Sequence, residues 1–345
     1  MMNKTSFSIG LVVLLLAITA TSCSKNDSSA SQQQEMTQDF KALVMGGKDI
    51  DPNQTWSTAV NTPISISVNL EAGSTYTVYI SETNPITSAS PKYLGMAKLM
   101  SGESRTIHIA VPAAVSHLYA SCYDSQGNVV CLPLSNNAAA FDNTNAGELT
   151  EKATEPVGNC MLYAFEFPGD NSIKDFDYND LVLSVSAPMD NGDGTFTSSV
   201  NIVAIGSTRI VTVLYNNEPL GSEVHEAMGI SKKSTINNSS FTREARRLGN
   251  LTFNSQDIDL GTLPFSVSIA NSDGNGSQIY VQSGAQDAPL FMAINGDENG
   301  KWYWPREGTN IGLAYLEFST WASNKNTATY WYHSSNGSTN QIVTW

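Results

Sequence analysis

Positive charge and histidine are scarce in this sequence. Its 345 residues include 18 Lys and Arg against 32 Asp and Glu, for a formal net charge of −14, and no Lys/Arg-rich segment offsets the acidic excess. A surface this acidic repels nucleic acid and anionic membranes. We therefore expect no nucleic-acid partner.

Catalytic sequence motifs are also absent. The sequence has no HExxH, GxSxG or phosphate-binding glycine loop, and its four histidines are scattered, at His108, His117, His225 and His333. Catalysis needs a nucleophile with a positioned base, a paired acid and base, or a metal-bound water. We expect His108 and His225 to be ordinary solvated side chains and predict that the protein is not an enzyme. A glycan-processing enzyme, which needs only two carboxylates at the right separation, is the less favoured alternative.

Long apolar runs are confined to the N-terminus. Lys4 and the apolar residues 9–18 (IGLVVLLLAI) have the order of a secretory signal peptide, and this run is too short to span a bilayer as a helix. The next residues, Ala20-Thr21-Ser22-Cys23, resemble the bacterial lipobox. That resemblance implies removal of residues 1–22 and stable anchoring through acyl chains, such as palmitate, on Cys23. The alternative is an ordinary signal peptide followed by a coincidental cysteine.

The residues after Cys23 favour display at a membrane surface. Residues 24–38 contain almost no large apolar side chain, so we expect a flexible tether over residues 23–38. Lys25-Asn26-Asp27 resembles the signals that send lipoproteins of Bacteroides-type bacteria to the outer surface. We therefore expect a lipoprotein of the outer membrane of a Gram-negative bacterium, located at the cell surface.

Charged residues make up only 14% of the chain, whereas Ser, Thr, Asn and Gly are abundant. This composition is typical of exported, mainly β proteins. Strict alternation of apolar and polar residues over 64–70 (ISISVNL) predicts a half-buried strand, and similar segments follow. We expect a β-sandwich over residues 57–145, loss of periodicity over 141–158, and a second β-rich domain over 159–345.

Two helices are expected in this β-rich chain. A short one over residues 39–44 ends at Gly46-Gly47, within a lead-in that covers residues 39–56. A late amphipathic helix of about three turns has its apolar face at Ile311, Ala314, Tyr315, Phe318, Trp321 and Ala322. Further aromatic side chains either stack on sugar rings or, as we favour, pack between sheet and helix: Tyr303, Tyr330, Trp331, Tyr332 and Trp345.

Two cysteines flank a predicted hairpin turn. A two-residue turn at Gln126-Gly127 would set Cys122 opposite Cys131. A disulfide is then one alternative, and two reduced cysteines packed as small apolar side chains are the other. Cys160 has no partner once Cys23 carries lipid.

The strongest chemical pattern is an acidic segment, Asp175-x-Asp177-x-Asn179-Asp180. Alternate residues of an extended segment point to one side, so these oxygen donors can face one hard cation, for which Ca²⁺ is better suited than Zn²⁺. The segment is not an EF-hand, because Asp180 stands where the loop needs glycine, so other ligands are required, and Glu166 is the nearest. The alternative is a set of acids that cap a turn and face water.

Three segments resemble a known family. They are 49–56 (DIDPNQTW), 163–166 (YAFE) with 175–182 (DFDYNDLV), and 302–305 (WYWP), which opens a WxWPxE…NI…AY..F..W pattern. They resemble the LruC-domain lipoproteins of Bacteroides-type bacteria. The resemblance implies an N-terminal Ig-like β-sandwich, a C-terminal LruC-type domain of sandwich or jelly-roll kind, and no defined biochemical activity.

These features together predict a non-catalytic surface lipoprotein. We expect an adhesin-like binding module, anchored in the membrane through its lipid, with a glycan or a protein at the cell surface as partner and Ca²⁺ as a structural cofactor. The alternative is a structural subunit of a fimbria-like assembly, for which residues 341–345 offer an edge strand.

Overall fold

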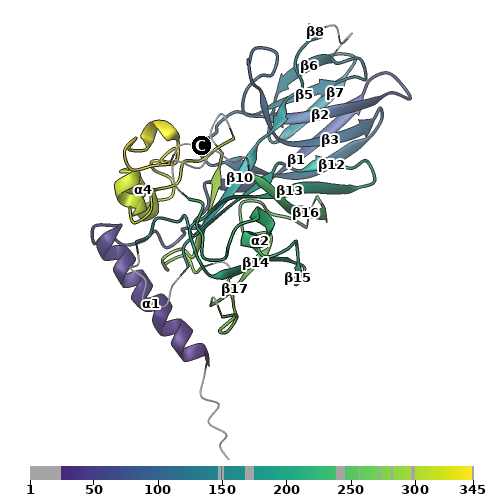
Figure 1. Ribbon diagram of the computed structural model, residues 1–345. Coiled ribbons are helices and arrows are strands. Elements are labelled where there is room, and N and C mark those ends of the chain that lie inside the picture. Colours follow the sequence, from purple (N-terminus) through teal and green to yellow (C-terminus); the bar gives the residue numbers. More distant parts are fainter. Residues whose placement is uncertain are drawn as a thin grey trace, which may run out of the picture.

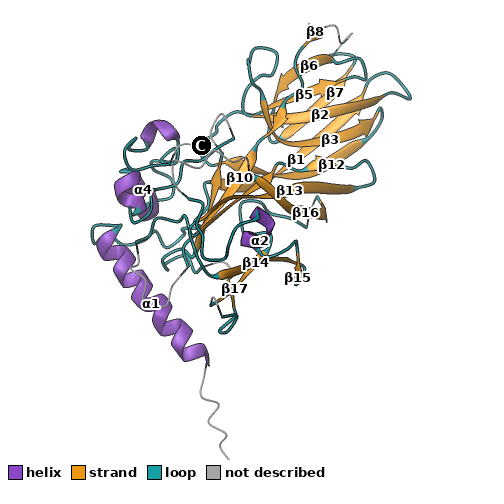
Figure 2. Cartoon of the chain, viewed as in Figure 1, coloured by secondary structure: helices purple, strands orange, loops and turns teal. Residues whose placement is uncertain are grey.

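A computed structural model of the chain describes residues 25–146, 149, 151–167, 175–237, 245–255, 257–271, 273–280, 283–296 and 300–343, with the side chains of α1 described from residue 32. The protein is mainly β, as the sequence predicts, and its described strands form four sheets (Figure 2).

The N-terminal half forms a sandwich of two sheets (Figure 1). One sheet has the order β4-β1-β7 and the other the order β8-β6-β5-β2-β3-β9. Alternation in β1 (Ala59–Asn69) buries Ile64, Ile66 and Val68 between the sheets. The other strands are β2 (Thr75–Ser81), β3 (Lys92–Met100), β4 (Ser104–Pro112), β5 (Tyr119–Tyr123), β6 (Asn128–Pro133), β7 (Ala138–Asp142), β8 (Glu151–Lys152) and β9 (Val157–Gly158).

The described part of the predicted boundary segment belongs to this sandwich. Residues 141–158 lack periodicity, yet they contain the end of β7 and the two short strands β8 and β9, which form the edges of the larger sheet. Strands of two residues are too short to produce a periodic pattern, so the sequence does not reveal them.

The C-terminal half is built on two further sheets. One has the order β12-β13-β11-β10-β19, with β16 paired to β13, and the other the order β15-β14-β17-β18. The bounds are β10 (Cys160–Phe165), β11 (Leu181–Ser186), β12 (Met189–Asp190), β13 (Thr195–Ile205), β14 (Ile210–Tyr215), β15 (Glu218–Pro219), α2 (Val224–Met228), β16 (Arg246–Asn254), β17 (Ser266–Ala270), β18 (Gln278–Tyr280) and β19 (Phe291–Asn295).

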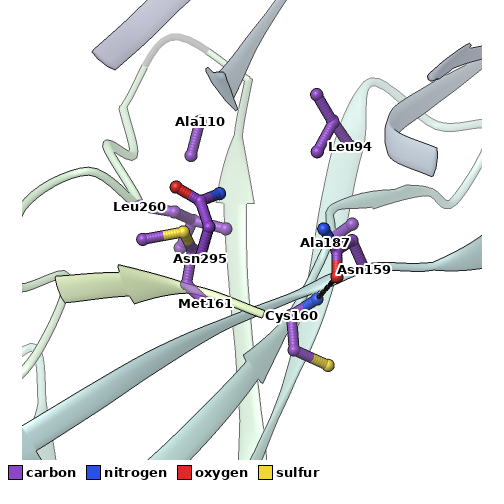
Figure 3. Close-up of a pocket in the computed structure, with 8 residues that line it drawn as sticks. All are labelled: Leu94, Ala110, Asn159, Cys160, Met161, Ala187, Leu260 and Asn295. Carbon is purple, nitrogen blue, oxygen red and sulfur yellow. Dashed lines mark hydrogen bonds between the residues drawn. The ribbon is translucent and has the colours of Figure 1, made fainter. Parts of the chain in front are cut away.

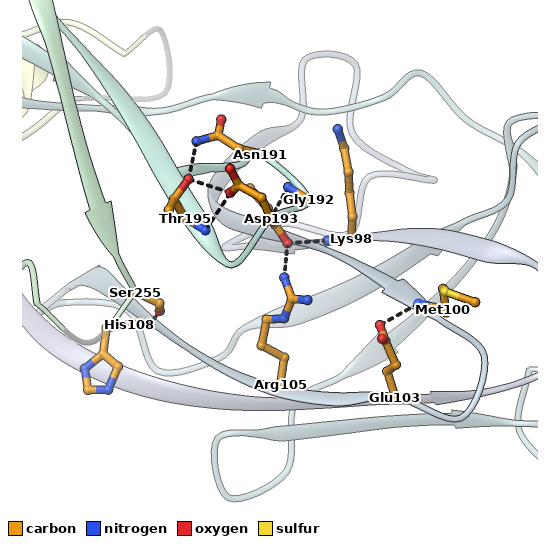
Figure 4. Close-up of polar contacts among 11 residues, drawn as sticks. Lys98, Met100, Glu103, Arg105, His108, Asn191, Gly192, Asp193, Thr195 and Ser255 are labelled. Carbon is orange, nitrogen blue, oxygen red and sulfur yellow. Dashed lines mark hydrogen bonds and ion pairs between the residues drawn. The ribbon is translucent and has the colours of Figure 1, made fainter.

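The two halves share one hydrophobic core. A single cluster of buried side chains includes Ile64 and Ile107 of the sandwich together with Leu183 and Phe291 of the C-terminal half. Polar contacts reinforce this junction (Figure 4): buried Asp190 forms an ion pair with Arg105 and accepts a hydrogen bond from the Lys98 backbone N–H at 2.9 Å. The two predicted domains therefore pack as neighbours with a continuous interior.

The predicted flexible tether is wrong over its described part. Helix α1 covers Lys25–Leu43, far longer than the predicted helix at 39–44, and ends before the left-handed Gly46 and Gly47. Met36 and Phe40 are buried at a spacing of four, and Val44 continues the stripe. Two buried side chains on a largely polar helix, with Val44 just after its end, are enough to hold it, because they enter a core that other segments provide. None of the described helices is long and apolar enough to cross a bilayer.

The late helix is broken into two. Helix α3 (Ile311–Ala314) and helix α4 (Phe318–Ser323) are separated by residues 315–317, of which Tyr315 has an extended backbone. The six predicted apolar positions are all buried, in a second core cluster that also contains Phe40, Trp302 and Trp331. The spacing therefore identified the buried face correctly, although the helix itself is interrupted.

The C-terminal segment differs from the predicted edge strand. Ile342 forms an isolated antiparallel bridge with Pro305, and both Ile342 and Val343 are buried. Residues 344–345 lie outside the described residues. The described part of this segment therefore belongs to the core.

The predicted opposition of Cys122 and Cys131 is also wrong. In the hairpin of β5 and β6, Cys122 pairs with Val130 and Ser121 pairs with Cys131. Neighbouring residues of a strand point to opposite faces, so the two cysteines lie on different sides of the sheet. Cys122, Cys131 and Cys160 are free thiols.

Candidate metal centre

The acidic segment 175–180 has an unusual backbone. Phe176 and Tyr178 both have a φ of 54°, which non-glycine residues rarely adopt. Both side chains are fully buried: the Phe176 ring meets Phe40 edge-on at 5.4 Å, and the Tyr178 hydroxyl donates to the Pro289 carbonyl at 3.1 Å. Alternate residues therefore anchor the segment in the aromatic core, and the aspartates between them point elsewhere.

Three carboxylates meet beside this segment. Oxygens of Glu166, Asp175 and Asp177 all lie within 4.8 Å of one another, and Glu166 and Asp177 are buried. Glu166 directly follows β10, and its two oxygens accept hydrogen bonds from the backbone N–H groups of Phe176 (3.3 Å) and Tyr178 (3.1 Å). These hydrogen bonds hold the segment against Glu166.

Burial makes these carboxylates hard to ionise. It raises the pKa of Glu166 well above its usual range, and the charges of Asp180, Asp177 and Asp175 add to the effect. Burial, followed by the charges of Asp175, Asp180 and Glu307, raises the pKa of Asp177 to about 9. Burial raises the pKa of Asp180 to about 7 and also raises that of Asp175. The cluster therefore holds protons near neutral pH unless a cation replaces them.

Asn179 and Asp180 are the other two predicted ligands. They lie outside the group of three carboxylates and are held by hydrogen bonds of their own. Asp180 accepts a hydrogen bond from the Phe167 backbone N–H at 2.6 Å. Asn179 donates to the Pro305 carbonyl at 3.2 Å and accepts from the Asn237 amide at 2.8 Å. Both side chains position the segment through these bonds.

Glu307 is a further acid near the cluster and is not among the ligands predicted from the sequence. Its charge acts on Asp175, Asp177 and Asp180, and the Asn237 side-chain amide donates to it. The neighbouring Gly308 N–H donates to Asp177 at 3.0 Å. The glutamate in the closing WxWPxE pattern is Glu307, so a signal for it was present.

This donor set suits a hard divalent cation. Carboxylate oxygens without cysteine or histidine are the ligands that Ca²⁺ prefers. None of the ion pairs within the described residues involves these five acids. A divalent cation held by Glu166, Asp175 and Asp177, with Glu307 nearby, would supply the charge that the cluster needs.

His225 is buried, contrary to the solvated state predicted for it. Its Nδ1 lies 2.6 Å from Glu223 and its Nε2 lies 2.9 Å from the Ser207 carbonyl. Glu223 also caps α2 by accepting from the backbone N–H groups of His225 and Glu226. Although burial opposes ionisation, these hydrogen bonds lower the pKa of Glu223. This pair fastens α2 to the segment after β13, which is a structural role.

A small cavity at the junction of the two halves offers no ligand site. It measures about 10 Å³ and is lined by Leu94, Ala110, Asn159, Cys160, Met161, Ala187, Leu260 and Asn295 (Figure 3). This is about the space of one water molecule. The predicted lipidation site, Cys23, lies outside the described residues.

Comparisons with known proteins give limited similarity. Residues 262–332 match a family described as a domain of unknown function (DUF4842). A crystal structure of a protein from Bacteroides ovatus, named as a candidate lipoprotein, has a TM-score of 0.39 and 14% sequence identity, covering 78% of this chain and 99% of that chain. Such a likeness is too weak to carry an activity across. Among curated proteins, none matches significantly.

Proposed function

We propose that this chain is a non-catalytic LruC-type lipoprotein, anchored through Cys23 in the outer membrane and displayed at the cell surface, where it binds a glycan or a protein partner. Calcium at the Glu166, Asp175 and Asp177 cluster stabilises its C-terminal half. The observation that carries the calcium site is the meeting of these three carboxylates within 4.8 Å in a largely buried setting.

The position of the cluster explains what the metal would do. Glu166 follows β10, Asp175 and Asp177 belong to the strained segment, and Glu307 belongs to the loop before α3. A cation shared among them joins Glu166 and the nearby acidic segment to Glu307, which lies much later in the chain. Because a ligand that binds only the folded state stabilises it, the metal would raise the stability of the whole half.

The binding role is favoured over the two alternatives for specific reasons. In a fimbria-like subunit, a terminal strand offered to a neighbour must be accessible, whereas the described part of the C-terminal segment is buried. In a glycosidase, two carboxylates flank an open cleft, whereas Glu166 and Asp177 are buried and hydrogen-bonded to backbone N–H groups.

The test is thermal melting of the purified full chain in detergent, with millimolar Ca²⁺ or with chelator. We expect Ca²⁺ to raise the melting temperature by several degrees, since a hundredfold excess over Kd adds about 2.7 kcal/mol. Asp177→Asn should lose this shift. Asp193→Asn is the matched control, because Asp193 is an exposed turn residue that accepts from Thr195. A calcium shift that survives in Asp177→Asn, or no shift in the parent chain, would refute the metal site.

A further inference from the structure

A cleft of about 550 Å³ opens where the two halves of the molecule meet. One side is formed by residues from the segment between β2 and β3 and by Lys92 at the start of β3, and the other by Tyr330, Tyr332 and His333. Asn159 and Gly296 complete the lining. Its volume falls within the range of small-molecule sites, which often lie between packed units.

One wall of the cleft is aromatic and rigid. The His333 ring packs edge-on against both Tyr330 and Tyr332, each at 4.9 Å. The Tyr330 hydroxyl donates to the Ala114 carbonyl at 3.1 Å, and the Asn336 amide donates to the Tyr330 carbonyl at 2.7 Å. Tyr330 nevertheless remains 44% exposed. A fixed, exposed ring loses little freedom when a ligand stacks on it.

The opposite wall is polar. It carries the carboxyl group of Glu82, the ammonium group of Lys92 and the hydroxyl groups of Thr83, Ser88 and Ser90. Burial raises the pKa of Glu82 to about 7, so near neutral pH this group both donates and accepts hydrogen bonds. The wall therefore offers donors and acceptors with little net charge.

We propose that this cleft binds a carbohydrate of one or two sugar rings, with the apolar face of a ring on Tyr330 and its hydroxyl groups directed to Glu82, Thr83 and Lys92. A sugar ring has an apolar face and a polar rim, which matches one aromatic and one hydroxyl-rich wall. A purely apolar ligand would leave Glu82 and Lys92 without polar partners, and a polyanion is disfavoured by the net charge of −14.

The cleft is suited to binding and not to cleavage. Glu82 is the single carboxylate among its described lining residues, whereas glycoside hydrolysis uses a pair. The inference rests on the proposed binding function and gives that function a site and a class of ligand.

The test is saturation-transfer NMR and calorimetry on the full chain in detergent and Ca²⁺, with maltose, cellobiose, lactose and N,N′-diacetylchitobiose as probes. We expect at least one of these disaccharides to bind. Tyr330→Ala should weaken binding about tenfold, whereas Tyr330→Phe, which keeps the ring, should retain it. Tyr215→Ala is the matched control, because its hydroxyl also donates to a carbonyl, that of Thr252 at 2.9 Å, outside the cleft.

A second experiment compares the binding of free disaccharides with the binding of polysaccharides. Amylose and cellulose are compared with maltose and cellobiose, and competition by the disaccharide would place both in the same cleft. Absence of binding by every probe, or binding that Tyr330→Ala leaves unchanged, would overturn the inference. The calcium-dependent melting shift is recorded on the same samples, so a chain that melts as expected but binds no sugar refutes the cleft alone. Sugar binding without a melting shift supports the cleft and refutes only the metal site.

Discussion

Replacing Asp177 by asparagine should stabilise the calcium-free protein at alkaline pH, although it removes a metal ligand. The folded state holds the Asp177 pKa at about 9, against 3.8 for an ordinary aspartate. The folded protein therefore keeps a proton that the unfolded chain releases as pH rises. The stability contributed by this group is complete below about pH 3.8 and is lost progressively as pH rises toward about 9.

The magnitude follows from the size of this shift. Each pH unit above 3.8 costs about 1.4 kcal/mol until the folded pKa is reached, so the loss is about 2 kcal/mol at pH 5 and about 6 kcal/mol at pH 8. Asparagine avoids this cost. Its amide cannot accept from both Asn179 and Gly308, whose N–H groups now donate to the two carboxylate oxygens at 3.2 and 3.0 Å. Losing one such bond costs about 1–3 kcal/mol.

The assay is urea unfolding in chelator, followed by tryptophan fluorescence. Asp177→Asn should be close to the parent in free energy of unfolding at pH 5 and about 3–5 kcal/mol more stable at pH 8. A hundredfold excess of Ca²⁺ over Kd should reduce this difference by about 2.7 kcal/mol, because only the parent binds the metal. Asp193→Asn should follow the parent throughout. A variant that is less stable in chelator at pH 8, with a difference that does not depend on pH, would refute the argument that the folded state opposes ionisation of Asp177.

Four further outcomes are expected. Glu307→Gln should weaken calcium binding about tenfold by calorimetry, because ligand charge sets affinity; an unchanged Kd would exclude Glu307 from the site. Gly206→Ala should lower stability by about 1–3 kcal/mol in urea, because a Cβ there would lie 2.4 Å from Asn179 Oδ1; an unchanged midpoint would contradict this packing. Phe40→Ala should cost about 3–5 kcal/mol in the same assay, whereas a lead-in helix that does not pack on the core would tolerate it. Thiol titration in denaturant without reductant should find Cys122, Cys131 and Cys160 all reactive, and loss of two thiols would indicate a disulfide.

The strands of the sandwich and the acidic segment were accessible from local patterns. Alternation at Ile64, Ile66 and Val68 fixes which face of β1 is buried, and the same period of two places Asp175 and Asp177 opposite Phe176 and Tyr178. In each case the information lies within a few neighbouring residues. Glu166 was reached only as the nearest acid, and its bonds to the backbone of the segment could not be foreseen.

The features that the sequence did not predict depend on contacts between residues that are far apart in the chain. The β5–β6 hairpin differs by one residue from the expected register, and a shift of one residue moves a side chain to the other face of a sheet. His225 is flanked by glutamates, which suggests exposure, but Glu223 and the Ser207 carbonyl enclose it. Met36 and Phe40 are too sparse to indicate a packed helix until the aromatic core that receives them is known.

The matched segment 262–332 is not a structural unit by itself. Its strand β17 pairs with β14, and β19 pairs with β10, so both depend on strands that precede the segment. Trp302, Phe318 and Trp321 are buried in a cluster that also needs Phe40 of α1 and Phe176 of the acidic segment. The charge of Glu307 likewise acts on the aspartates of residues 175–180. The smallest unit that satisfies these contacts therefore begins at α1, and a metal bound by the acidic cluster would join the parts of that unit that the chain itself leaves far apart.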